Sequence, residues 1–140
     1  MEWFSASLNV TDNELVPEEI TRLLGQQPTE SQTKDIPLLR EDGSVRRIPR
    51  FGRWSRTLKV KQTDEWDVAE VVRMLFAGLP DSQDVWNQVA KQGEICISLG
   101  LSVSTGSQDF AFDSKLIKML ADRSAAVWFD VYRETGDGAP

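Results

Sequence analysis

The sequence predicts a single α+β domain in which helices cover one face of a largely antiparallel sheet. Apolar and polar residues alternate in several segments, as they do in half-buried strands. Between these segments apolar residues recur three and four positions apart, as on one face of a helix. The 140 residues are 40% hydrophobic and 27% charged, which is typical of a globular chain with one core. We therefore assign residues 1–133 to one domain and expect the polar, glycine-containing residues 134–140 to form a disordered tail.

The N-terminal part predicts one strand, one short helix and a long irregular loop. Trp3–Val10 alternates in the strand pattern. Pro17 suits the first turn of a helix, where its missing N–H costs nothing, and Gly25 is placed to cap the end of that helix. Gln26–Phe51 contains three prolines and few apolar residues, so it is expected to be a loop, with a small hairpin across Asp42-Gly43.

The central part predicts a second strand followed by two helices. Trp54–Lys61 alternates again. Thr63 or Asp64 is expected to cap the next helix, and the apolar residues of Val68–Leu79 fall on one helical face. A further helix is expected to end at Gly93.

The C-terminal part completes a ferredoxin-like arrangement. Its expected elements are a strand at residues 94–104, a short strand at 108–112, a helix capped by Ser114 and a strand at 125–133. From Trp54 onward the order is β-α-β-β-α-β, the ferredoxin-like order, with the first strand and helix as an N-terminal extension. We expect the Val68–Leu79 stripe to form the main core contact with the apolar face of Ile95–Val103.

Missing residue types exclude several classes of site. The sequence contains no histidine and one cysteine, Cys96. Serine and cysteine nucleophiles activated by histidine, histidine-ligated metals and multi-cysteine clusters are therefore excluded. No phosphate-binding glycine loop or calcium loop is present. We assign no catalytic residue, no metal ligand and no cofactor, and a role other than catalysis is favoured.

The charge is unevenly distributed along the chain. The net charge is −6, yet Lys34–Lys61 holds nine basic and three acidic residues, and the other 112 residues hold seven basic and nineteen acidic ones. Five arginines lie close together with two aromatic residues: Arg46, Arg47, Arg50, Phe51, Arg53, Trp54 and Arg56. This segment fits a solvated loop with internal salt bridges, a contact with a protein or small anion, or a nucleic-acid surface.

Asp130 is the most specific candidate for a binding site. It lies between Phe129 and Val131 in a predicted strand, where a buried carboxylate needs a cation. Arg53 or Arg56 is the expected partner. That pair would place Trp54, Trp128 and Tyr132 around one polar spot. The candidate ligand- or partner-binding residues are therefore Arg46, Arg47, Arg50, Arg53, Trp54, Arg56, Trp128, Asp130 and Tyr132.

Three segments resemble a known family. They are Pro17–Thr21 continuing through Leu24-Gly25 to Pro28-Thr29, Gly52–Ser55 opening a strand, and the closing helix followed by Phe129–Tyr132. In this order and spacing they resemble the bacterial domain-of-unknown-function family 4279, over roughly Phe4 to Arg133. The resemblance implies a free-standing bacterial protein of the cytosol. It brings no activity, cofactor or catalytic residue.

Three functions remain open at this stage. The leading one is a non-enzymatic binding module for a protein partner, of the kind found in immunity proteins that neutralise a partner; an acidic chain suits a basic partner. The second is a small-ligand sensor or enzyme with an Arg/Asp/Tyr pocket. The third is a weak single-stranded nucleic-acid binder using Arg46–Arg56. The single cysteine favours the cytoplasm, and neither a membrane segment nor a secretory signal is expected.

Overall fold

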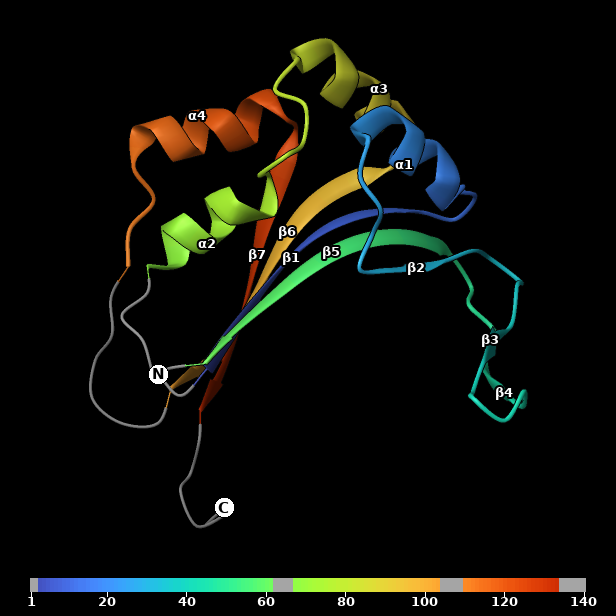
Figure 1. The fold of residues 1–140 in the computed structure, drawn as a ribbon. Coiled ribbons are helices and arrows are strands. Elements are labelled where there is room, and N and C mark those ends of the chain that lie inside the picture. The colour runs from blue at the N-terminus through green and yellow to red at the C-terminus, as the bar shows by residue number, and fades with distance from the viewer. Residues whose placement is uncertain (1–2, 62–66, 104–109, 134–140) are drawn as a thin grey trace.

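The computed structural model describes residues 3–61, 67–103 and 110–133, and it contains four helices and a five-stranded sheet with a separate two-stranded hairpin (Figure 1). The elements in chain order are β1 (Trp3–Asp12), α1 (Pro17–Leu24), β2 (Glu30–Gln32), β3 (Leu38–Leu39), β4 (Val45–Arg47), β5 (Gly52–Lys61), α2 (Val68–Leu75), α3 (Gln83–Gln92), β6 (Glu94–Val103), α4 (Ser114–Asp122) and β7 (Ala125–Arg133). The mixed α+β class predicted from the sequence is confirmed. The tail predicted at residues 134–140 lies outside the described residues.

The N-terminal strand is the centre of the sheet rather than an extension of it. The strand order is β2-β5-β1-β6-β7. β1 pairs with β5 and β6 in antiparallel orientation, β2 pairs with β5 in the same way, and β6 and β7 are parallel. The ferredoxin-like topology is not confirmed. A short strand was expected at residues 108–112, but its described part, residues 110–112, does not form a strand.

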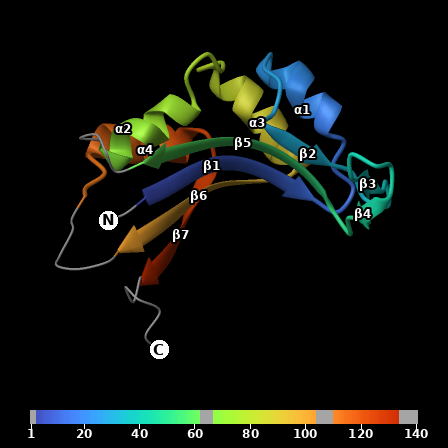
Figure 2. The same cartoon turned by 60° about the horizontal axis from the view of Figure 1, so that its bottom comes forward.

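All four helices lie on one face of the sheet, and no described helix covers the other face, which is concave (Figure 2). One face of β1 and one face of β6 point into the core beneath the helices and are almost fully buried. These residues are Phe4, Ala6, Leu8 and Val10 on β1 and Ile95, Ile97, Leu99 and Leu101 on β6. The prediction that the Val68–Leu79 stripe packs mainly on the strand now labelled β6 is wrong. Because β1 is inserted between β5 and β6, α2 packs chiefly on β1 and β5, and α3 contacts β6.

Two helices are capped by other residues than the sequence predicted, and for α4 the difference is one residue. α2 begins at Val68, and the carboxylate of Asp67 accepts a hydrogen bond from the Ala69 N–H at 2.9 Å. The predicted caps Thr63 and Asp64 lie outside the described residues. α4 begins at Ser114, and Asp113 is its cap, accepting from the Leu116 N–H at 2.8 Å. In both helices an aspartate side chain satisfies a free N–H and carries a negative charge at the positive end of the helix. At α4 it takes the place of the expected Ser114 cap.

The long loop is more ordered than its composition suggested. The predicted hairpin is present as β3 and β4, and β2 pairs with the start of β5, which was not predicted. Gly52, where β5 begins, lies against Leu15, and a side chain there would place its Cβ 2.5 Å from the Leu15 carbonyl oxygen. Only glycine therefore allows the loop to enter the sheet at this point.

Among the described residues, no helix is long and apolar enough to cross a membrane.

Candidate binding surfaces

The structure separates the predicted site residues into three groups. Trp54 and Arg56 point toward the helices, because they share the face of β5 that pairs with the buried residues of β1. Trp54 is fully buried, and its indole N–H donates to the Thr21 hydroxyl at 3.1 Å. Arg56 donates to the Ala77 carbonyl at 2.8 Å. The stacking platform that Trp54 would have offered to a nucleic acid is therefore absent.

The predicted ion pair between Asp130 and an arginine of the Arg46–Arg56 segment is wrong. Asp130 lies on β7 and Arg53 on β5, with β1 and β6 between them, which separates their backbones by about 14 Å at the usual strand spacing. Asp130 is exposed, and its carboxylate accepts a hydrogen bond from the Tyr132 hydroxyl at 2.6 Å. Water solvates this carboxylate at the edge of the sheet, so it needs no cation.

The contact between Asp130 and Tyr132 predicts a raised tyrosine pKa. Because the hydroxyl donates to Asp130 and the carboxylate charge opposes the phenolate, we expect the pKa of Tyr132 to lie above its ordinary value of 10. Tyr132 is the only tyrosine in the sequence, so ultraviolet absorbance follows its titration directly. Asp130→Asn should lower this pKa, whereas Asp35→Asn, on the other side of the molecule, should leave it unchanged. Identical titration curves for the native chain and Asp130→Asn would contradict the contact.

The centre of the uncovered sheet face contains small polar side chains that bond to one another. Asn9 lies at its centre on β1 and connects three strands. Its amide donates to the hydroxyls of Ser7 at 3.1 Å and Ser98 at 3.2 Å, and its carbonyl accepts from the Ser55 hydroxyl at 2.6 Å. These contacts satisfy the polar groups within the sheet itself and explain why this face remains stable without a covering layer.

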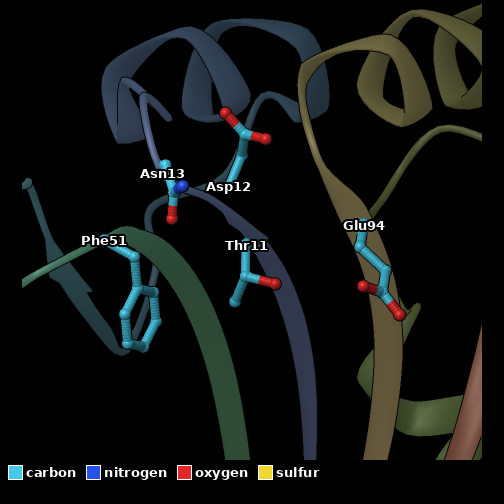
Figure 3. Close-up of a pocket in the computed structure, with 5 residues that line it drawn as sticks. All are labelled: Thr11, Asp12, Asn13, Phe51 and Glu94. Carbon is cyan, nitrogen blue, oxygen red and sulfur yellow. The ribbon is translucent and has the colours of Figure 1, made fainter.

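Two hollows lie near the end of the sheet where β1 meets the long loop. The larger is about 480 Å³ and is lined by Thr11, Asp12, Asn13, Phe51 and Glu94 (Figure 3). Its two carboxylates come from different strands, and the Phe51 ring forms the opposite wall. No sequence signal marks it, because its lining residues are brought together only by the pairing of β1 with β5 and β6. The described residues contain no group of three or more side chains suited to hold a metal ion.

The smaller hollow has a volume of about 270 Å³ and is lined in part by the arginine-rich segment. It lies between the β3–β4 hairpin and the β2 edge of the sheet, and Arg46, Arg47 and Arg53 line it together with Glu30 and Gln32. Arg50 is exposed and is not part of this lining. Three of the predicted arginines therefore do share one site, but without the aromatic residues that were expected beside them.

The β7 edge contains the other predicted residues and a run of exposed apolar and aromatic side chains. Trp128 is 68% exposed, Phe129 49%, Val131 60% and Tyr132 49%. Trp128 and Tyr132 point to the uncovered face, and Phe129 and Val131 point to the helix side, where Phe129 stacks on Phe110 at 6.0 Å. The alternating pattern predicted this strand. Its position at an outer edge, which exposes both faces, could not be read from the pattern.

The fold and these surfaces define a small α+β domain with one uncovered sheet face, one exposed edge strand and an arginine-lined hollow. The chain belongs to the family described as Domain of unknown function (DUF4279), which matches residues 1–134. The resemblance seen in the sequence is thereby confirmed. No curated protein and no solved structure is significantly similar to the chain.

Proposed function

We propose that the chain is a non-enzymatic protein-binding module that pairs the outer edge of β7 with an extended segment of a protein partner. One observation carries this proposal. β7 has a strand neighbour on only one side among the described residues, and it exposes four large side chains on its two faces. An edge of this kind offers backbone hydrogen bonds for affinity and side-chain contacts for selectivity.

The two outer strands of the sheet differ in how well they are protected. β2 has three residues, includes the charged Glu30, and lies beside the β3–β4 hairpin. β7 has nine residues, Ala125–Arg133, with no proline, no glycine and no lysine. Proteins usually shorten, bend or charge an edge strand to prevent pairing with other chains. β7 is long and is not interrupted by proline or glycine, and its charged residues are Asp130 and, at its end, Arg133. Most of the strand therefore lacks these protections, which favours pairing as its function.

The charge distribution favours a basic partner over a second copy. Outside Lys34–Lys61 the chain has a net charge of −12, and β7 lies in this acidic part with Asp130 on its uncovered face. Two copies would repel each other, whereas a basic segment would be attracted and would associate faster. Neutralisation of a basic partner, as by an immunity-type protein, is one form of this function. The single cysteine supports a reducing compartment such as the bacterial cytoplasm.

The experiment titrates the full chain with an eight-residue peptide of alternating valine and lysine, capped at both ends, and follows backbone amide signals by NMR. We expect shifts confined to β7 and its neighbour β6, and binding that weakens as salt is added. The matched peptide with glutamate in place of lysine should bind at least tenfold more weakly. A valine–lysine peptide with alternate backbone nitrogens methylated should lose binding, because it cannot complete the strand pairing.

Two variants of the protein provide the control. Val131→Lys puts a positive charge on the proposed surface, and it should abolish peptide binding without unfolding because this side chain is exposed. Met74→Lys places the same charge at an exposed position of α2 and should leave binding unchanged. Shifts spread over the whole acidic surface, or equal binding by both variants, would contradict the proposal. A stable dimer that Val131→Lys disrupts would also contradict it, because a second copy would then occupy the edge.

A further inference from the structure

The arginine-lined hollow lies at the opposite edge of the sheet from β7, so what it binds is independent of the proposed strand pairing. Its two walls come from different parts of the chain. The β3–β4 hairpin contributes Arg46 and Arg47 together with two leucines, and the sheet contributes Arg53 together with Glu30 and Gln32. A ligand held here would contact the hairpin and the sheet at the same time.

The positive charges of this hollow are not neutralised by the described residues around it. Arg53 approaches Glu30 only to 3.9 Å, the outer limit of an ion pair, and its Nε is buried without a hydrogen-bond acceptor. The side chain of Arg46 forms no hydrogen bond or ion pair with any described residue. Three guanidinium groups thus face one carboxylate, which leaves an excess of two positive charges. A buried N–H without a protein acceptor is unusual in folded proteins and is explained by an acceptor from water or from a bound ion.

A buried glutamine holds one of the three arginines in place. Gln32 is 3% exposed, and its side-chain amide donates to the Phe51 carbonyl at 3.1 Å. This bond also fixes the direction of the amide oxygen of Gln32. That oxygen accepts a hydrogen bond from Arg47 at 2.6 Å. The guanidinium of Arg47 is therefore held against the sheet before any ligand binds. Guanidinium groups arranged in this way bind oxyanions through paired N–H groups, which lysine cannot do.

We propose that this hollow binds a small oxyanion with two or more negative charges, a phosphate or a polycarboxylate, between Arg46, Arg47 and Arg53. The volume of about 270 Å³ lies just below the usual range of roughly 300–1,000 Å³ for ligand pockets, which restricts the ligand to a small molecule. The excess of two positive charges matches such an anion. Because the anion would join the β3–β4 hairpin to the sheet, its binding slows amide exchange in residues 38–47.

The test titrates the full chain with inorganic phosphate, with citrate and with acetate at constant ionic strength, using calorimetry and amide hydrogen exchange. We expect phosphate or citrate to bind saturably and at least tenfold more tightly than acetate, and to protect residues 38–47. The anion that binds more tightly shows whether the ligand is a phosphate or a polycarboxylate.

Three variants locate the binding. Arg46→Gln and Arg53→Gln should each weaken binding of that anion at least tenfold. Arg46 has no described polar partner to lose, so its variant remains folded even if Arg53→Gln does not. Arg22→Gln removes the same charge from α1, where Arg22 forms an exposed ion pair with Glu19, and it should leave binding unchanged.

Two results would overturn the proposal. One is equal affinity for acetate, phosphate and citrate, or an equal effect of Arg46→Gln and Arg22→Gln, which would indicate general charge attraction. The other is binding of a short thymidine oligonucleotide with a steep salt dependence while phosphate and citrate fail to bind. That pattern would assign the arginines to a nucleic-acid surface.

Discussion

Trp54→Ala is expected to lower the free energy of unfolding by about 3–5 kcal/mol, the usual cost of truncating a buried aromatic side chain. Trp54 is fully buried between β5 and α1, and its indole N–H bonds to Thr21 on that helix. The substitution removes this hydrogen bond and leaves a cavity where the helix is attached to the sheet. Urea denaturation followed by circular dichroism measures the change.

Trp128→Ala is the matched control, because it makes the same substitution on an exposed edge. Trp128 points to solvent from β7, so its removal should change the free energy of unfolding by no more than about 0.5 kcal/mol. Comparable losses for the two variants, or a loss below about 1 kcal/mol for Trp54→Ala, would mean that Trp54 does not pack beneath α1.

Leu75→Ala is expected to cost about 2–5 kcal/mol, as for other fully buried leucines. Leu75 is the last residue of α2 and belongs to the core between this helix and the sheet. The preceding residue, Met74, is exposed on the same helix. Met74→Ala should therefore change the unfolding midpoint only slightly. If Met74→Ala proved more costly than Leu75→Ala, α2 would present the opposite face to the sheet.

The local elements could be predicted from the sequence because their signals are local. β7 begins and ends at the predicted residues, since the alternation in Ala125–Arg133 depends only on neighbouring positions. Gly25 caps α1 with φ of 73°, a left-handed conformation that glycine readily adopts. The helix expected to end at Gly93 is present as α3, which ends at Gln92 with Gly93 as its cap.

The neighbours of each strand could not be predicted, and the errors in the candidate site follow from this. The ion pair expected for Asp130 assumed that β7 lies near β5, whereas β1 and β6 separate them. The expectation that Trp54 lies near Asp130 failed for the same reason, because its face of β5 packs under the helices. Arg56, two residues later, reaches the edge of the helix layer and donates to a carbonyl there. The grouping of Arg46, Arg47 and Arg53 depends on how the hairpin lies against the sheet, which no local pattern encodes.

The central position of β1 has a consequence for the order of folding. β1 is the first strand to be synthesised, yet Trp3 pairs with Lys61 on one side and with Ser102, 99 positions later, on the other. Contacts so distant in sequence require large loops to close, which slows folding. During synthesis β1 must therefore wait without either neighbour until β5 emerges from the ribosome, and it remains open on its other side until β6 follows. The central strand of this chain thus spends most of the synthesis of its own domain as an unpaired edge, which is the period of greatest risk for aggregation.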